Sequence, residues 1–134
     1  MLNEDVRQLV RDRAENRCEY CRLRQEHQSF KRFQIEHVIA KQHLHDDSLE
    51  NLAFACDRCN LHKGTNLSSV DVETSEIVRL FHPRRDVWAD HFALVGFEMI
   101  GLTPIGRATV RLLQMNAERR LRLRSILHRC DELD

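Results

Sequence analysis

The sequence has no hydrophobic run long enough to cross a membrane. Its longest apolar stretch, residues 92–97, is far shorter than the roughly 20 residues that a transmembrane helix needs. The first residues are acidic, and no apolar segment of an export signal follows them. We therefore expect a cytoplasmic protein without a membrane partner.

The chain also lacks an excess of charge. Lys and Arg together number 21, as do Asp and Glu, so the net charge is zero. This balance argues against a protein that holds nucleic acid by bulk electrostatics alone. Lysine is scarce, because 18 of the 21 basic residues are Arg, and the planar guanidinium suits phosphate contacts as well as surface ion pairs. The composition leaves both interpretations open.

The length of 134 residues fits one domain and is too short for two full cores. Hydrophobic residues make up 42% of the chain and charged residues 31%, which is enough apolar material for a core beneath an ionic surface. No internal repeat, low-complexity tract or flexible linker is visible in the sequence. We expect a single domain over residues 1–134.

Apolar spacing predicts a helix near each end of the chain. Residues 3–15 have one apolar face, and Asn3 can cap the helix that they form. A long helix is predicted over residues 103–130, because Thr103 can cap it and Pro104 suits its first turn.

Strands and one short helix are predicted between these two helices. The short helix covers residues 56–63 and ends at Gly64. The predicted strands cover residues 30–39, 76–81 and 92–102, the last of them a hairpin that turns near Gly96.

The long C-terminal helix is basic although the whole chain is neutral. Between Arg107 and Arg129 there are seven Arg and a single acidic residue, Glu118. Such a stripe is either a solvated face or a face toward phosphates. Asn116 and Arg119 interrupt the apolar side, so a polar contact with the rest of the protein is a further option.

Two cysteine pairs are the strongest motif. Cys18 and Cys21 form one Cys-x-x-Cys, and Cys56 and Cys59 form another, with 34 residues between the pairs. Four thiolates complete the tetrahedral shell of one Zn²⁺, so we predict a structural zinc. A redox pair is the alternative, but it needs only one of the two motifs. Cys130 is expected to be a small buried apolar residue.

A second group of residues suits a catalytic metal ion and a general base. Glu36 and Asn60 offer a carboxylate and an amide oxygen, ligands for Mg²⁺ or Mn²⁺. His37 can take a proton from an attacking water at physiological pH. Asn51 can orient the imidazole through its side chain or its backbone. Because a lone His in a strand is often structural, that alternative stays open.

The order of these motifs resembles the zinc-containing HNH endonuclease family, in a variant with Asn in the last position. The resemblance covers residues 16–66, the core, and implies a ββα-metal fold, one catalytic divalent ion and phosphodiester hydrolysis. It implies that His37 is the general base, that Asn51 orients it, and that Asn60 and Glu36 bind the ion. Residues 67–134 resemble a C-terminal extension found in a bacterial subset of the family.

The sequence departs from the family pattern at three points. Glu36 stands where the family usually has Asp, and Asn60 stands where it often has His. The loop after His37 has Ala40 where Pro is usual, and Leu44-His45 where two Gly are usual.

Two basic residues of the predicted short helix are candidates for nucleic-acid binding. Lys63 lies three residues after Asn60 and so shares its helix face. Arg58 is the second candidate.

Together these observations predict an α+β fold: a zinc-stapled ββα-metal core with an N-terminal helix, extra antiparallel strands and a long C-terminal helix. The predicted function is a metal-dependent endonuclease that acts on DNA, with structural Zn²⁺ and catalytic Mg²⁺ or Mn²⁺. The alternatives are a zinc-stabilised module that binds nucleic acid without cutting it, and a protein-interaction module. The sequence does not predict the oligomeric state.

Overall fold

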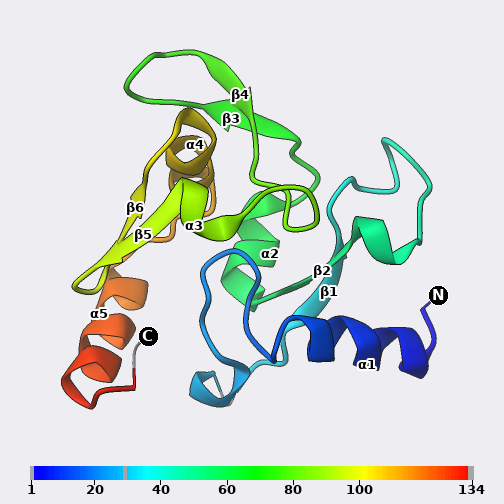
Figure 1. Cartoon of the computed structure of the whole chain (residues 1–134), viewed down its shortest axis with the longest axis horizontal. Helices are drawn as coiled ribbons and strands as arrows, with labels where there is room; N and C mark the ends of the chain where they lie inside the picture. Colours follow the sequence, from blue (N-terminus) through cyan, green and yellow to red (C-terminus); the bar gives the residue numbers. More distant parts are fainter. Residues whose placement is uncertain (1, 29, 133–134) are drawn as a thin grey trace. The chain divides into compact units, whose positions relative to one another are not determined.

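A computed structural model describes residues 2–28 and 30–132 (Figure 1). The chain divides into two compact units. Unit 1 contains the chain up to Leu67 together with His82–Asp86, and unit 2 contains Ser68–Phe81 and the chain from Val87 onward. This division falls close to the predicted border between core and extension. That the whole of residues 1–134 behaves as one domain stays a prediction.

Unit 1 begins with helix α1, Glu4–Arg13. The side-chain oxygen of Asn3 accepts a hydrogen bond from the Val6 amide at 2.9 Å, so the predicted cap is confirmed. Val10 and Ala14 are buried, and the helix packs against strand β2, Leu52–Ala55.

The centre of unit 1 is an antiparallel strand pair followed by a helix. Strand β1, Gln34–His37, pairs with β2, so that Glu36 lies opposite Ala53. Helix α2, Asp57–Lys63, follows β2 and contacts β1. Because strand side chains alternate between faces, Glu36 is buried while the next residue, His37, is partly exposed.

Both ends of this ββα segment are defined by local features. The helix ends at Gly64, as predicted, and the φ of Gly64 is +52°, a conformation that glycine adopts without strain. Two short 3₁₀ helices, η1 at Gln25–His27 and η2 at Leu49–Asn51, precede the two strands.

Unit 2 is built from two more hairpins and three helices. Strand β3, Ser68–Val70, pairs with β4, Ile77–Arg79, and β5, Phe92–Val95, pairs with β6, Glu98–Gly101. The predicted turn near Gly96 is confirmed, with a φ of +64° there. The sequence did not predict β3 or the short helix α3, Trp88–His91. The remaining helices are α4, Pro104–Leu112, and α5, Glu118–Arg129.

The segment predicted as one long helix is divided into α4 and α5. The break has a physical cause in Asn116, whose side-chain amide accepts from Met99 N and donates to Met99 O, both at 2.8 Å. The buried Arg124 donates to the carbonyl oxygen of Met115, a group that a continuous helix would have paired, and to that of Phe97 in the β5–β6 turn. The predicted polar contact of Asn116 is confirmed.

The start of α4 is as predicted. The Thr103 hydroxyl accepts from the Gly106 amide at 3.0 Å, and Pro104 occupies the first turn. Gly106 is required by close packing, because a Cβ there would lie 2.0 Å from the carbonyl oxygen of His91. None of the helices in the described ranges is long and apolar enough to cross a membrane. The α+β prediction is confirmed.

Candidate functional site

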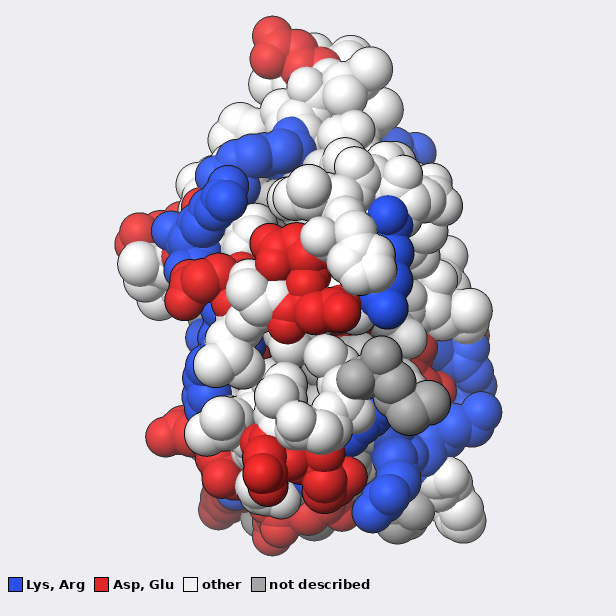
Figure 2. Space-filling view, turned by 90° about the vertical axis from the view of Figure 1, so that its right-hand side faces the viewer, with Lys and Arg blue, Asp and Glu red and all other residues white. Residues whose placement is uncertain are grey.

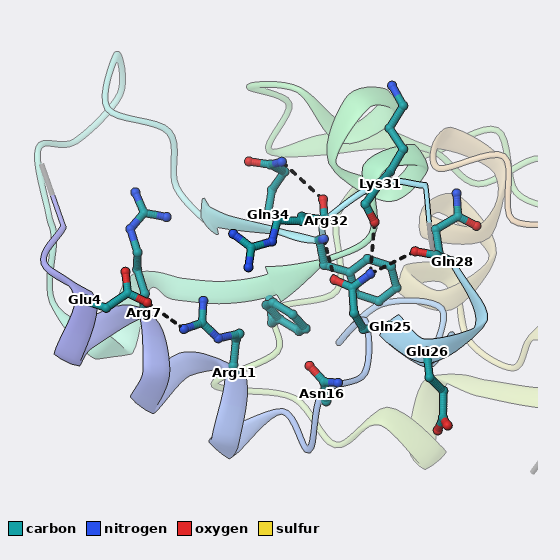
Figure 3. Close-up of a pocket in the computed structure, with 12 residues that line it drawn as sticks. Glu4, Arg7, Arg11, Asn16, Gln25, Glu26, Gln28, Lys31, Arg32 and Gln34 are labelled. Atoms are coloured by element: carbon teal, nitrogen blue, oxygen red, sulfur yellow. Dashed lines mark hydrogen bonds and ion pairs between the residues drawn. The ribbon is translucent and has the colours of Figure 1, made fainter.

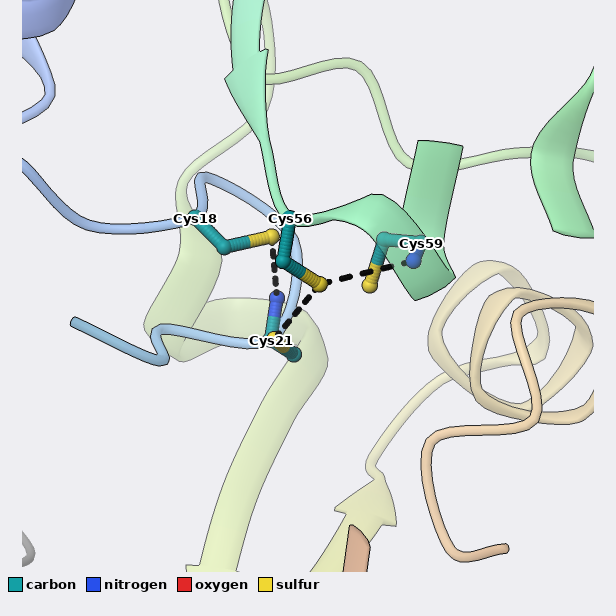
Figure 4. Close-up of side chains that lie close together, drawn as sticks. All are labelled: Cys18, Cys21, Cys56 and Cys59. Carbon is teal, nitrogen blue, oxygen red and sulfur yellow. Dashed lines mark hydrogen bonds between the residues drawn. The ribbon is translucent and has the colours of Figure 1, made fainter. Parts of the chain in front are cut away.

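The four cysteines of the two Cys-x-x-Cys motifs meet in unit 1 (Figure 4). Their sulfur atoms all lie within 4.8 Å of one another, and all four residues are buried. Cys21 Sγ and Cys56 Sγ are 3.7 Å apart. Tetrahedral zinc with bonds of about 2.3 Å requires sulfur separations of about 3.8 Å, so the cluster fits this ion.

Local backbone geometry shapes both halves of the cluster. The amides of Cys21 and Cys59 point at the first sulfur of their own motif, at 3.5 Å from Cys18 Sγ and 3.4 Å from Cys56 Sγ. Cys56 is also the N-cap of α2, so the zinc-binding turn and the start of this helix are one feature. Each motif therefore presents its two sulfurs in one direction.

The chemistry of the thiols agrees with a structural metal site. None of the four thiols forms a disulfide. A redox site needs only one Cys-x-x-Cys motif, whereas two motifs converge here. Burial raises the pKa of Cys18 and Cys59 well above the usual range, so zinc binding must displace protons from them. In contrast to the prediction, Cys130 is exposed, because it is the C-cap residue of α5, where the helix ends.

Glu19, between the two cysteines of the first motif, ties the zinc cluster to its surroundings. Its backbone N donates to Phe54 O, and its carboxylate accepts from Phe54 N, both at 2.8 Å. The same carboxylate pairs with the guanidinium of Arg84. Residues 82–86 therefore belong to the scaffold of the zinc site, a role that the sequence did not reveal.

Glu36, the predicted metal ligand, is 6% exposed, and both of its carboxylate oxygens have partners within the protein. Its Oε1 accepts from the Tyr20 hydroxyl, and its Oε2 lies 3.5 Å from Lys63 Nζ. Burial raises the pKa of the Glu36 carboxyl, while the Lys63 charge and the Tyr20 hydrogen bond oppose this rise. Neither partner was anticipated from the sequence.

Lys63, predicted to contact nucleic acid, is 2% exposed. Its ammonium donates to Val38 O at 2.8 Å in addition to the pairing with Glu36. Contact with an external phosphate would require the ammonium to leave both partners. The structure thus gives Lys63 an internal role, as the counter-ion of Glu36.

His37, the predicted general base, has a carboxylate partner. Its Nε2 lies 2.7 Å from Asp47 Oδ1, and this hydrogen bond lowers the pKa of Asp47. Asp47 comes from the loop between the two strands, and Lys41 and His45 of the same loop lie 3.9 Å and 3.7 Å from its carboxylate. Sequence reasoning missed Asp47, because only the fold of the loop brings it to the ring.

Asn51, predicted to orient His37, is buried and holds the loop instead of the ring. Its side chain accepts from Ile39 N at 2.9 Å and donates to Ile39 O at 3.1 Å and to Asp46 O at 2.8 Å. Its backbone oxygen accepts from Val38 N at 2.9 Å. Asn51 thereby fixes the residues next to His37 and those next to Asp47.

Asn60 and Arg58, on α2, line a shallow hollow of about 320 Å³ together with Lys31, Gln34, Asp57 and Leu61. The predicted residues thus come from two elements in contact. Glu36 and His37 are consecutive in β1, and Asn60 and Lys63 are one turn apart on α2.

Comparison with known proteins identifies this segment. Residues 18–66 match the family model of the HNH endonuclease family. Comparison with curated proteins gave no match, and comparison with solved structures gave none either. The match spans both cysteine motifs, β1, β2 and α2, and together with the cysteine cluster it confirms the predicted resemblance over these residues. It supports a nuclease-type function and implies a nucleic-acid substrate.

Proposed function

We propose that this protein is a metal-dependent HNH endonuclease that hydrolyses phosphodiester bonds in DNA. The observation that carries the proposal is the pairing of His37 with Asp47 at 2.7 Å, directly after Glu36 in a zinc-stapled ββα segment. A histidine held by a carboxylate is a general base whose orientation is fixed before the substrate arrives.

The chemistry of His37 follows from this pairing. When Nε2 donates its proton to Asp47, the lone pair of Nδ1 is free to accept a proton from water. The water then attacks the phosphorus atom as its proton passes to the imidazole. The Asp47 carboxylate stabilises the positive charge that develops on the ring during this step.

The donors that we assign to the catalytic divalent ion come from β1 and α2. A carboxylate from Glu36 and an amide oxygen from Asn60 are ligands that Mg²⁺ and Mn²⁺ accept. The Lys63 ammonium lies 3.5 Å from Glu36, so binding of the ion requires this ion pair to rearrange. When bound, the ion supplies positive charge beside the scissile phosphate and the departing 3′ oxygen.

Three further residues support the reaction without taking part in proton transfer. Asn51 fixes the backbone on both sides of the His37–Asp47 pair through four hydrogen bonds. We assign to Arg58, which lines the same hollow as Asn60, a contact with a phosphate of the substrate. Lys63 is buried, and its ammonium balances the charge of the Glu36 carboxylate.

One observation favours a second candidate function, a module that binds nucleic acid without cutting it or binds another protein. Both oxygens of Glu36 already have partners, Tyr20 and Lys63. A divalent ion at Glu36 has to compete with the Lys63 ammonium, and a module that has lost catalysis has no need for the ion.

A nicking assay separates these functions. Supercoiled plasmid is incubated with wild-type protein and with His37→Ala in Mg²⁺, Mn²⁺ or Zn²⁺, and in EDTA. We expect nicking by the wild type with Mg²⁺ or Mn²⁺ and its loss in His37→Ala. His128→Ala, which removes an exposed histidine of α5, serves as the matched control and should cut like the wild type. Retarded but uncut plasmid would favour the non-cleaving module.

A further inference from the structure

A hollow in unit 1 lies between α1 and the start of β1 (Figure 3). Its volume is about 640 Å³, and its floor is formed by the buried rings of Phe33 and Phe54, whose centroids are 5.4 Å apart. Four of its lining residues are basic and two are acidic, so the hollow is locally positive although the chain is neutral: Arg7, Arg11, Lys31 and Arg32 against Glu4 and Glu26.

Three of these four cations have no side-chain partner among the described residues: Arg7, Lys31 and Arg32. Arg11 differs, because its guanidinium bonds to Glu4 at 2.9 Å and to Gln8 at 3.0 Å. In Figure 3 the guanidinium groups of Arg7, Arg11 and Arg32 lie in the same part of the hollow, while Lys31 extends away from them. Unpaired cations around a recess can receive an anion without first breaking an internal ion pair.

Hydrogen bonds from Gln25 hold the backbone on one side of the hollow. Gln25 accepts from Phe33 N at 2.7 Å and donates to the carbonyl oxygens of Lys31 and Gln28. This single side chain fixes the backbone that carries Lys31 and Arg32. The backbone that carries these two cations is therefore ordered before a ligand binds, which reduces the conformational entropy lost on binding.

The hollow leads to the proposed active site. It shares Lys31 and Gln34 with the smaller hollow that Asn60 and Arg58 line. Gln34 is three residues before His37 in β1, a distance of about 10 Å along a strand. Measured along the axis of a DNA duplex, where each nucleotide of a strand rises about 3.4 Å, this equals about three nucleotide steps.

From these observations we infer that the hollow between α1 and β1 binds the phosphate backbone of the substrate nucleic acid, about three nucleotides from the scissile bond. The inference rests on the proposed function for its cleavage position, but the binding surface itself is independent of catalysis. On the face shown in Figure 2, basic and acidic side chains are intermingled. Local clusters of cations, rather than net charge, must then select the polyanion.

The test uses full-length protein with His37→Ala, which removes the proposed base and leaves the hollow unchanged. Binding of a fluorescent DNA duplex is measured by anisotropy over a range of salt concentrations, with and without Arg7→Gln/Lys31→Gln/Arg32→Gln. We expect the triple change to raise Kd at least tenfold and to flatten the slope of log K against log salt by about two to three. The matched control is Arg111→Gln/Arg119→Gln/Arg129→Gln, which removes the same charge from exposed positions of α4 and α5.

The two sets of variants give distinct outcomes. Equal weakening by both triples would overturn the inference, as would unchanged binding in the α1–β1 triple or absence of DNA binding at low salt. Binding of an acidic peptide but not of DNA would overturn it as well. Nicking by the same triple in a chain that retains His37 is measured separately, and we expect a higher KM with little change in kcat. If DNA binds through the hollow but wild-type protein never cuts it, the proposed endonuclease activity fails and the binding site stands.

Discussion

His37 and Asp47 are ten residues apart in the chain, and their side chains meet at 2.7 Å. The intervening loop returns to the strand because Asn51 bonds to the backbone at both of its ends, at Ile39 and at Asp46. The loop, which contains Ala40 and Leu44-His45, brings a carboxylate to the imidazole. Orientation of the proposed base therefore depends on two residues: Asp47, which contacts the ring, and Asn51, which places Asp47.

We expect Asp47→Asn to lower kcat about 10- to 100-fold, since it keeps the size of the side chain but removes the charge that orients and stabilises the imidazole. His37→Ala should cost about 10²- to 10⁴-fold, the range for a general base. Single-turnover nicking rates measure both effects, and circular dichroism checks that the variants fold.

Asp46→Asn is the matched control, because the Asp46 carboxylate accepts from Ser48 N and, among the described residues, makes no hydrogen bond with the imidazole of His37. We expect it to cut at close to the wild-type rate. A full rate in Asp47→Asn would contradict the positioning role.

Much of the secondary structure and the cysteine cluster could be predicted from the sequence, because their determinants are local. The caps at Asn3 and Thr103, the stop at Gly64 and the spacing of the cysteines each act within a few residues. The resemblance also pointed to the strand that carries Glu36 and His37 and to the helix that follows.

The contacts that decide the chemistry of the site could not be predicted. Tyr20 reaches Glu36 across 16 residues, and Lys63 reaches Val38 across 25, so neither pairing leaves a local pattern. The break before α5 was missed for the same reason, because Asn116, in the segment between α4 and α5, bonds to Met99 in the β5–β6 hairpin. Long-range hydrogen bonds override the helical periodicity there.

Removal of zinc should unfold the core of unit 1. Structural zinc sites contribute about 10–16 kcal/mol in small domains, and whole proteins are stable by only about 5–15 kcal/mol. We expect Cys56→Ser, or treatment with a strong chelator, to abolish zinc binding and to expose the amides of β1, β2 and α2 to hydrogen exchange.

Zinc content by mass spectrometry and exchange rates by NMR give the two readouts. Cys130→Ser changes the exposed cysteine outside the cluster, and it should retain one zinc per chain. Protected β1 and β2 amides in the metal-free protein would contradict the structural role of the ion.

Lys63→Met should destabilise the protein by about 3–5 kcal/mol, because it leaves the buried Glu36 carboxylate without its cation. The double variant Glu36→Gln/Lys63→Met removes both charges, and we expect it to recover a large part of this loss. Urea unfolding of the wild type, the two single variants and the double variant yields the coupling energy.

The control for chain length and lost charge is Lys41→Met, which changes an exposed lysine and should alter stability little. Additive effects of the two single changes would show that Glu36 and Lys63 are not coupled. Nicking by the double variant is expected to be absent, since Glu36→Gln also removes the proposed metal ligand.

The stability of unit 2 should fall at acid pH through Asp71. Its carboxylate, which is 0% exposed, accepts two hydrogen bonds from Arg107, each at 2.9 Å, and others from Glu73 N and Thr74 Oγ1. These contacts, that of Arg107 above all, lower the pKa of Asp71 to about 2. An unfolded Asp titrates at about pH 3.9, so the contribution of Asp71 to the free energy of unfolding is complete above that pH and is lost as the pH falls toward 2.

Trp88, the single tryptophan, packs on Phe92 in unit 2 and reports the unfolding of this unit by fluorescence. We expect the Tm of the wild type to fall more steeply between pH 5 and pH 2 than that of Asp71→Asn, which should start several degrees lower at pH 6. The exposed Asp90→Asn should follow the wild-type curve, and parallel curves for the wild type and Asp71→Asn would show that the Arg107 pair does not govern acid stability.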